Sequence, residues 1–594
     1  MPRQSATTQP PGAVPPTHKA VFDRRFVRHL WRLTRIYWTS PDARKGLGLL
    51  VLCISGELGM VYGNVHLAVA QSHVFDAVQN KEWTAFLTAI EVFLGVALLV
   101  VFVSTYRIYV RNILQIRWRT QLTDHFLGEW MGPHAYLHRE LHHNDADNPD
   151  QRISEDIQSY VASALGLSLS LLTAVATLIS FAGILWTLSG EWPLRIGGHE
   201  LWIPGLMMWV AILYAIVSMW LTHLVGRRLV SINFNRLRFE ADFRYGLVRF
   251  RDHVEAVALA RGENVEHRGA LARFTNVVNN WWLLITAQRN LTLLTSGIGQ
   301  ANGIVPLLVA APAFFAGRMT LGAVTETQFA YGQVSGALSW FVDAYQEIAA
   351  WRASIERLAT FAELLESTRA ELARGDGIRV ETGAPDALEV VHVGLAQPNG
   401  TVLAADLNAR IGAGERVAVL GPAGPIKSTL FRAVAGLWPF GSGRIELPGQ
   451  CYPLFLPPQP YLPIGSLRDA VCYPSPQGTF SDQRIGEVLQ LVDLDHLTGR
   501  LDESEPWDQQ LSIDEAQRLT FARALLHEPE WLVMDDATGA LDEAMEKRIY
   551  ELLAQHLPRA AVVSITNRQA VQQYHQRSWT IPANPEPSAA LQAG

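Results

Sequence analysis

The sequence predicts a protein of two parts: an α-helical transmembrane domain of six spans, followed by an α/β domain that binds a phosphate-bearing ligand. Three observations support this prediction. Six stretches are long and apolar, arginines gather on one side of those stretches, and residues 418–429 have a strand–loop–helix pattern with a lysine after the loop. A chain of 594 residues is also too long for a single hydrophobic core.

Each of the six apolar stretches is long enough for a bilayer crossing, which takes about 20 residues. They lie near residues 47–70, 86–110, 161–189, 203–225, 292–317 and 322–346. The last two are less apolar, and we expect them to line a polar cavity rather than to face lipid. Their polar side chains include Asn302, Glu326, Gln328 and Gln333.

The placement of basic residues predicts the orientation of the spans. Arginines crowd the segment before the first span and the connections at 111–160 and 227–290, whereas the three opposite loops carry Lys81, Arg195 and Arg318. The positive-inside rule then places both termini and the two long connections in the cytoplasm.

The two long connections continue the helical pattern beyond the bilayer, at residues 111–130 and 233–260. Spans two and three, and likewise four and five, are therefore predicted to project into the cytoplasm as helical hairpins. Residues 22–38 interleave aromatic residues with arginines. This pattern favours a helix at the cytoplasmic membrane surface over a fully solvated charged helix.

These patterns predict the following domain boundaries. A transmembrane domain covers residues 21–358, a charged and glycine-rich linker covers 359–385, and an α/β nucleotide-binding domain covers 386–582. Residues 1–20 and 583–594 are predicted to be disordered tails, with no cleavable signal peptide.

Composition argues against other classes of protein. The net charge is −7 with no compact basic patch, which argues against a nucleic-acid binder. The three cysteines are widely spaced and suggest neither a disulfide framework nor a zinc site.

The pattern after the strand at 417–420 is typical of a phosphate-binding loop, in which backbone N–H groups surround the phosphates. The loop comprises Gly421, Pro422, Ala423, Gly424, Pro425, Ile426, Lys427, Ser428 and Thr429. Lys427 supplies a positive charge and Ser428 holds Mg²⁺. Ile426 stands where the pattern has glycine, so we expect either a strained loop or an opened one, and weaker phosphate binding in both cases.

Residues 147–156 read DNPDQRISED, with a turn predicted at Asn148-Pro149 and a helix that begins near Ser154. By itself this stretch indicates a polar elbow. It closely resembles the NPDQR-I-x-E-D stretch of one ABC transporter subgroup, the bacterial SbmA/BacA-type peptide and cobalamin uptake transporters, whose relatives include peroxisomal fatty-acyl transporters. Residues 279–282, 336–343 and 436–439 are also similar to the bacterial members.

The resemblance extends over residues 22–580 and implies an exporter-type ABC fold. It further implies a homodimer in a bacterial inner membrane that binds ATP and Mg²⁺ and transports a small solute or peptide. In the nucleotide site it assigns Asp535, with Ser428, to the metal, and it places Asp536 and Asn567 at the positions of the catalytic base and the switch histidine. Asp536 is one methylene shorter than the usual Glu, and Asn567 cannot become cationic.

Gln459 and Ser512 complete the nucleotide contacts that the resemblance implies. Pro458 occupies the usual glutamine position before Gln459, and Asp514 replaces a glycine in the signature loop, where its carboxylate would face the phosphates bound by the partner. Together with Ile426, Asp536 and Asn567, these changes predict weak or absent ATP hydrolysis in every composite site of a dimer.

Three functions remain open at this point. The first is a transporter that imports peptides, cobalamin-like or other hydrophilic or amphipathic solutes. The second is a proton-gradient-driven transporter of the same fold, and the third is an inactive scaffold or regulatory subunit. Glu57, Glu91, Glu326 and Asp343 fall within the apolar stretches, where carboxylates either serve transport or pair with arginines. Both roles remain open for Glu57, whereas the polar neighbours of Glu326 favour a transport role.

Overall fold

The computed structural model describes residues 24–132, 148–189, 191–196, 199–374, 377–384, 387–422, 424–449 and 453–582. The chain forms two compact units. The membrane unit comprises Met1–Phe126 and Asn148–Phe361, and the nucleotide unit comprises Leu127–Asp147 and Ala362–Gly594. The predicted tails, 1–20 and 583–594, lie outside the described residues.

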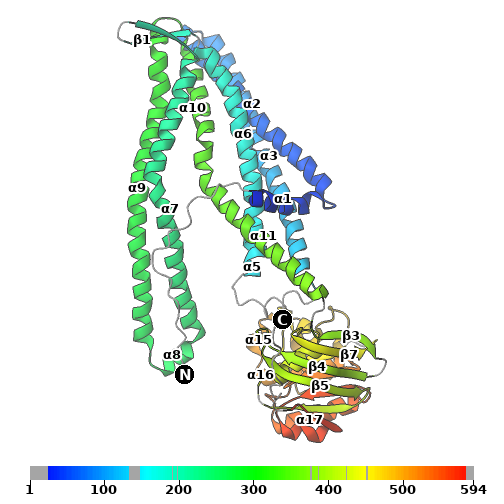
Figure 1. Cartoon of the computed structure of the whole chain (residues 1–594). Helices are drawn as coiled ribbons and strands as arrows, with labels where there is room; N and C mark the ends of the chain where they lie inside the picture. Colours follow the sequence, from blue (N-terminus) through cyan, green and yellow to red (C-terminus); the bar gives the residue numbers. More distant parts are fainter. Residues whose placement is uncertain are drawn as a thin grey trace, which may run out of the picture. The chain divides into compact units, whose positions relative to one another are not determined.

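The membrane unit is built from long helices (Figure 1). In chain order its elements are α1 (Arg24–Trp38), α2 (Ala43–Asn80), α3 (Trp83–Trp130), α5 (Pro149–Gln151), the π-helical turn η1 (Arg152–Asp156), α6 (Ile157–Ser189), β1 (Glu191–Ile196), β2 (His199–Pro204), α7 (Leu206–Asp252), α8 (Val254–Leu259), α9 (Glu263–Phe315), α10 (Leu321–Asp343) and α11 (Tyr345–Arg374), whose last turns belong to the nucleotide unit. The unbroken helices α3 and α7 confirm the predicted helical extensions beyond the second and fourth apolar stretches.

Five helices of the described chain are long and apolar enough to cross a membrane. They are Ala43–Asn80, Trp83–Trp130, Pro149–Ser189, Leu206–Asp252 and Glu263–Phe315. The predicted count of six spans is therefore not confirmed, because α10 is not among them. Helix α10 packs against α2, α6, α7 and α9. It buries Ala330, Tyr331 and Val334 completely.

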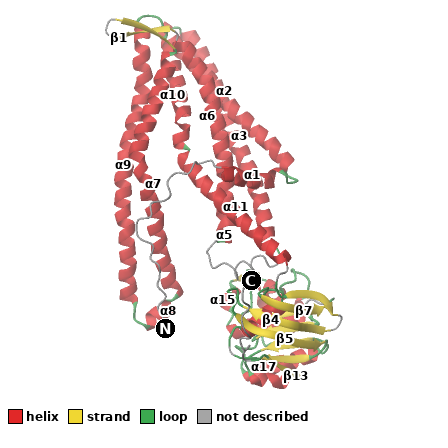
Figure 2. Ribbon diagram, in the orientation of Figure 1, coloured by secondary structure: helices red, strands yellow, loops and turns green. Residues whose placement is uncertain are grey.

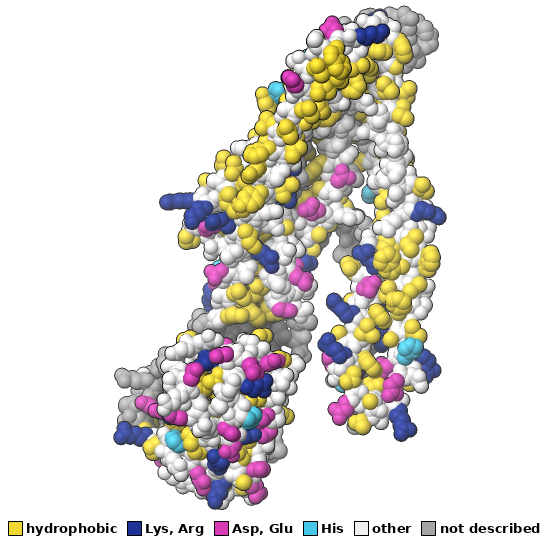
Figure 3. All heavy atoms as spheres, turned by 180° about the vertical axis from the view of Figure 1, so that it is seen from behind, with side chains coloured by type: hydrophobic (Ala, Val, Ile, Leu, Met, Phe, Trp, Pro, Cys, Tyr) yellow, Lys and Arg dark blue, Asp and Glu magenta, His cyan; other side chains and the backbone are white. Residues whose placement is uncertain are grey.

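The outer faces of the membrane helices expose large apolar side chains (Figure 3). On α3, for example, the exposed fraction is 71% for Leu98, 61% for Val101 and 57% for Phe102. So much contiguous apolar surface is unfavourable in water and fits the hydrocarbon of a bilayer.

The N-terminus of α10 is capped by side chains of α2. The Asp76 carboxylate accepts a hydrogen bond of 2.8 Å from the Gly322 N–H, and Gln79 Oε1 accepts one of 2.5 Å from the Leu321 N–H. These bonds satisfy two of the N–H groups that the first turn of a helix leaves free. A Cβ atom on Gly322 would lie 2.2 Å from the Ser72 carbonyl oxygen, so only glycine permits this approach.

The DNPDQRISED stretch begins a helix earlier than predicted. Pro149 occupies the first helical turn, a position that its fixed φ favours, and Ser154 lies inside η1. Asp156 is buried, accepts a 2.7 Å hydrogen bond from Arg152 and accepts another of 2.9 Å from Arg357 Nε on α11. The motif therefore ties the start of α6 to α11.

The nucleotide unit contains two main sheets (Figure 2). Its further elements are β3 (Arg379–Ala384), β4 (Ala387–Ala396), β5 (Val402–Gly412), β6 (Arg416–Leu420), α12 (Ile426–Val434), β7 (Gly441–Pro448), β8 (Leu454–Leu456), β9 (Gly465–Ser466), α13 (Leu467–Cys472), α14 (Asp482–Leu491), η2 (Asp495–Arg500), β10 (Ser504–Glu505), α15 (Trp507–Gln510), α16 (Ile513–His527), β11 (Trp531–Asp535), α17 (Glu543–His556), β12 (Ala561–Ile565), η3 (Gln569–Tyr574) and β13 (Arg577–Thr580). Where the sequence predicts a linker at 359–385, α11 continues to Arg374 and β3 begins at Arg379.

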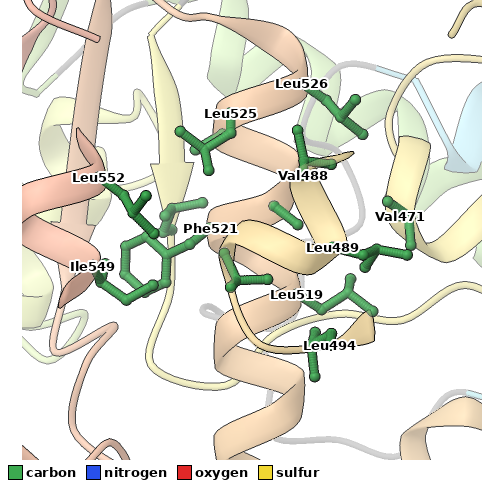
Figure 4. Close-up of a cluster of buried hydrophobic side chains, with 14 of the residues drawn as sticks. Val471, Val488, Leu489, Leu494, Leu519, Phe521, Leu525, Leu526, Ile549 and Leu552 are labelled. Atoms are coloured by element: carbon green, nitrogen blue, oxygen red, sulfur yellow. The ribbon is translucent and has the colours of Figure 1, made fainter. Parts of the chain in front are cut away.

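The larger sheet is parallel, with the strand order β13-β6-β12-β11-β8, and the smaller has the order β3-β7-β4-β5. Behind the parallel sheet, α16 contributes Leu519, Phe521 and Leu525 to a core that α14 and α17 complete (Figure 4). This packing fixes the strand ends, where the polar residues described below are placed.

Gly322→Ala should lower the stability of the membrane unit by about 1–3 kcal/mol, because the added methyl group overpacks the α2–α10 contact. Thermal unfolding in detergent, followed by tryptophan fluorescence, measures the change. Gly332→Ala is the matched control on the same helix, since a Cβ there meets no heavy atom within 4 Å. Equal melting temperatures for the two variants would contradict the close approach.

Candidate functional site

Four neighbouring parallel strands bring the predicted nucleotide residues to one edge of the sheet. In register, Val419 of β6 lies beside Ile565 of β12, which in turn lies beside Asp535 of β11. The segments that follow these strands carry the phosphate loop, Asn567 and Asp536, and β8 leads to Gln459. Ligands of parallel sheets bind at the carboxyl ends of the strands.

The Lys427 ammonium is buried and all of its hydrogens have acceptors. It donates hydrogen bonds of 3.0 Å to the Gly421 carbonyl and 2.8 Å to the Pro422 carbonyl, and a third to Asn567 Oδ1. An ammonium has three hydrogens to donate. The group expected to contact phosphate is thus occupied by the loop and by the residue at the switch position.

Of the two expected consequences of Ile426, a strained loop or an opened one, the structure does not show the first. Ile426 is the first residue of α12, so its backbone is helical, and its side chain packs against the core between the two sheets. The left-handed conformation falls instead on Gly424, with φ +137°. Ala423 lies outside the described residues.

Pro425 changes the loop in a way that we did not expect from the sequence. It lies directly before α12, and a proline has no N–H to donate. Its carbonyl accepts a 2.8 Å hydrogen bond from the Thr429 N–H, as the first regular bond of the helix. The loop therefore offers one backbone donor fewer to a phosphate. Because proline has no N–H, Pro425 in the sequence could have indicated this loss.

Ser428 and Asp535 fit a magnesium ion. The Ser428 hydroxyl hydrogen-bonds the Asp535 carboxyl, and both are hard oxygen ligands of the kind that Mg²⁺ prefers. Burial raises the pKa of this carboxyl above its ordinary value, while the hydrogen bond from Ser428 opposes that rise. A bound cation would favour the ionised form, since it adds the positive charge that the buried site needs.

The two predicted catalytic residues are each held by a neighbour. Asp536 adopts φ +47°, and its carboxylate accepts a 2.9 Å hydrogen bond from the Thr566 hydroxyl. Asn567 accepts from Lys427. Thr566 follows β12, the parallel neighbour of β11, whereas Lys427 lies in the first turn of α12.

The loop that contains Gln459 is fixed through its backbone. Gln459 itself is exposed, but the Pro458 carbonyl accepts a 3.0 Å hydrogen bond from Gln517 Nε2. The same Gln517 side chain accepts a 2.9 Å bond from the Ala540 N–H. Gln517, which is buried on α16, therefore joins this loop to the segment after β11.

Ser512 caps the N-terminus of α16 and is surrounded by carboxylates. Its hydroxyl lies 2.6 Å from Asp514 Oδ1 and 2.7 Å from Glu515 Oε2, and Asp514 also pairs with Arg518 at 2.8 Å. The Ser512 hydroxyl, followed by Arg518, holds the pKa of the Asp514 carboxyl below its ordinary value despite partial burial. Two negative charges thus occupy the helix end that would otherwise attract a phosphate.

The membrane unit contains a second polar site. A cavity of about 400 Å³ lies between α2, α3, α6 and α10, and Glu57 lines it. The Glu57 carboxylate accepts hydrogen bonds of 2.5 Å from Arg107 and 2.7 Å from Thr173, which confirms the alternative that it pairs with an arginine. Glu326 is partly buried on α10 and does not line this cavity, whereas Glu91 is exposed on α3.

Two family models match the chain. The ABC transporter transmembrane region 2 model matches residues 33–315, and the ABC transporter model matches residues 404–539. The first falls on the membrane helices, and the second on the segment that runs from β5 through α16 to Gly539.

Several known proteins are similar over most of their length. An uncharacterized ABC transporter ATP-binding protein of Synechocystis is 35% identical, over 88% of this chain and 78% of the relative. The inner membrane ABC transporter ATP-binding protein YddA of Escherichia coli is 28% identical, over 91% and 94%. The human lysosomal cobalamin transporter ABCD4 is 24% identical, over 93% and 94%.

The fold and the site define a membrane protein fused to a phosphate-loop nucleotide-binding domain. With these matches, the chain belongs to the ABC transporter family, in the half-size arrangement of one membrane region and one ATP-binding region.

Pro425→Ala should tighten ATP binding about tenfold, because it restores one backbone donor to an anionic ligand. Ile426→Gly should change the affinity much less, since Ile426 is unstrained. Titration with a fluorescent ATP analogue, in the presence of Mg²⁺, measures both. A larger gain from Ile426→Gly would contradict this account of the loop.

Asp514→Asn should strengthen ATP-induced association of two nucleotide units severalfold, because it removes a negative charge from the end of α16. Energy transfer between labelled copies of the full chain in nanodiscs reports this association. Asp495→Asn, at an exposed acid of η2, is the control. Equal responses from the two variants would show that the Asp514 charge does not matter.

Proposed function

We propose that this chain forms a homodimeric transporter in a bacterial inner membrane, within the SbmA/BacA-like group. It moves hydrophilic or amphipathic solutes inward, such as peptides or cobalamin-like compounds. Helix α10 serves as the sixth span, and both termini are cytoplasmic. The similarity to a cobalamin transporter and to an inner membrane protein supports this proposal.

In this proposal the nucleotide units bind Mg²⁺-ATP but hydrolyse it slowly. The observation that carries the proposal is the Lys427 ammonium, whose three hydrogens are all taken. Binding of a phosphate at Lys427 has to replace at least one of these bonds, so part of the binding energy is spent on opening the site. A phosphate also receives no backbone donor from Pro425.

Hydrolysis needs a base within reach of the attacking water and a charged group near the leaving phosphate. The Asp536 side chain is one methylene shorter than the usual Glu and accepts a hydrogen bond from the Thr566 hydroxyl. Asn567 supplies no positive charge. ATP binding, rather than its hydrolysis, then provides most of the signal that reaches the membrane unit. In a homodimer each ATP site combines the phosphate loop of one chain with the signature loop of the other, so both sites carry the same changes.

The ATPase activity of the reconstituted wild type should lie below about one tenth of that of the variant Ile426→Gly/Asp514→Gly/Asp536→Glu/Asn567→His, since a one-methylene withdrawal of a base alone costs orders of magnitude. Phosphate release measures both. The quadruple variant with Lys427→Ala added is the control that gives the background rate of phosphate release. Strong hydrolysis by the wild type would overturn the proposal of a weak ATPase.

A second candidate, transport driven by a proton gradient, is favoured by Asp343. Its carboxylate lines the membrane cavity and forms no hydrogen bond or ion pair with the described residues. Uptake into vesicles that have a pH gradient and no ATP would support this candidate. Uptake that requires ATP and stops in Lys427→Ala would exclude it. A chain that transports under neither condition, but copurifies with a complete ABC transporter, would be a regulatory subunit.

A further inference from the structure

The cavity of the membrane unit contains two charged groups that have no ion-pair partner among the residues that the structure describes. Its charged lining residues are Glu57, Arg107, Arg111 and Asp343. Glu57 and Arg107 neutralise each other at 2.5 Å. Arg111 and Asp343 form no ion pair with each other or with any other residue in the described ranges.

Arg111 lies one helical turn beyond Arg107, so both side chains project from the same face of α3. The Arg111 Nε atom is buried from solvent and has no hydrogen-bond acceptor within the described chain. A guanidinium stays charged at every physiological pH, and its planar edge suits a carboxylate. Arg111 as a whole is only partly buried and lines the cavity, so its guanidinium can pair with an anionic group from outside the chain.

Asp343 is the last residue of α10 and exposes its carboxylate. Helix α11 begins two residues later, at Tyr345, so the ends of two helices meet here and their opposite partial charges offset each other. The carboxylate itself, which has no cationic partner among the described residues, is the group that attracts a cation, such as an ammonium group.

Small residues line much of the cavity that contains the two charges. Gly332, Gly336 and Ala337 line the cavity on α10, and Gly166 and Ala174 line it on α6. Trp340 forms part of the wall, fixed by a 3.0 Å hydrogen bond from its Nε1 to the Ser170 hydroxyl. A volume of about 400 Å³ lies within the usual range for small-ligand sites.

We propose that this cavity binds a dipolar solute, one that carries both a carboxylate and an amine, such as a short peptide with free ends. The carboxylate pairs with Arg111 and the ammonium group with Asp343, while the Glu57–Arg107 pair is part of the wall. The inference rests on the proposed transport function and names the chemistry of its substrate.

The test uses the full chain in lipid nanodiscs and radiolabelled trialanine as the probe. Unlabelled trialanine, its N-acetyl form and its C-terminal amide then compete for binding. The wild type should bind each capped form at least tenfold more weakly. Arg111→Gln should remove the penalty for the amide and keep the penalty for the acetyl form, and Asp343→Asn should do the reverse. Arg111→Lys should keep both penalties.

The matched controls are Arg238→Gln and Asp242→Asn, which change exposed residues of α7 outside the cavity and should behave as the wild type. Failure of the wild type to bind trialanine, or equal binding of all three peptides, would overturn the proposal. So would an equal loss for every probe in Arg111→Gln and Asp343→Asn when both variants still bind ATP.

Uptake into vesicles separates this inference from the function on which it rests. Transport of trialanine and of both capped forms at equal rates would support the proposed transport function and overturn the proposal that the cavity binds a dipolar solute. Selective binding without uptake under ATP or a pH gradient would keep the site and overturn transport.

Discussion

A buried ammonium must find acceptors, and this requirement organises the nucleotide site. Lys427 takes two carbonyls of its own loop and the amide oxygen of Asn567. The third contact exists because β6 and β12 are parallel neighbours, with Val419 opposite Ile565. The sheet register therefore decides which side chain meets the lysine. Lys427 thus links the phosphate loop to Asn567, and a phosphate that binds to either of them affects the other.

The two polar sites of the chain differ in how far the protein satisfies its own charges. In the nucleotide unit, the three altered residues with polar side chains have internal partners: Asn567 has Lys427, Asp536 has Thr566, and Asp514 has Ser512 and Arg518. In the membrane cavity, Arg111 and Asp343 have none among the described residues. An internally satisfied site resists a ligand, whereas an unsatisfied one favours a ligand. This contrast agrees with the proposal of a chain that binds a solute in its membrane cavity and hydrolyses ATP slowly.

Patterns within one element were predictable, and contacts between elements were not. Of the six apolar stretches predicted as spans, five fall in helices long and apolar enough to cross a membrane, and the long helical extensions were also predicted, because hydropathy and helical period are local properties. The phosphate-loop pattern was also recognisable, but the sequence left open whether Ile426 strains the loop or opens it; as the first residue of α12, Ile426 has a helical backbone and is not strained. Nothing in the sequence indicates that Glu57 pairs with Arg107 and not Arg111, or that Gln517 holds Pro458, since these pairs are 50 and 59 residues apart.

The cap that α2 places on α10 limits how the membrane unit can move. Because Asp76 and Gln79 hold the first N–H groups of α10, and Gly322 lies against the α2 backbone, a sliding of one helix along the other would break both bonds and produce a clash. The two helices are thus coupled as a rigid pair at that end. Any opening of the cavity between them and their neighbours then has to come from α3 and α6, or from a bend near Ala344, where α10 ends and α11 begins. The α2–α10 side of the cavity would then stay fixed while the opposite side changes.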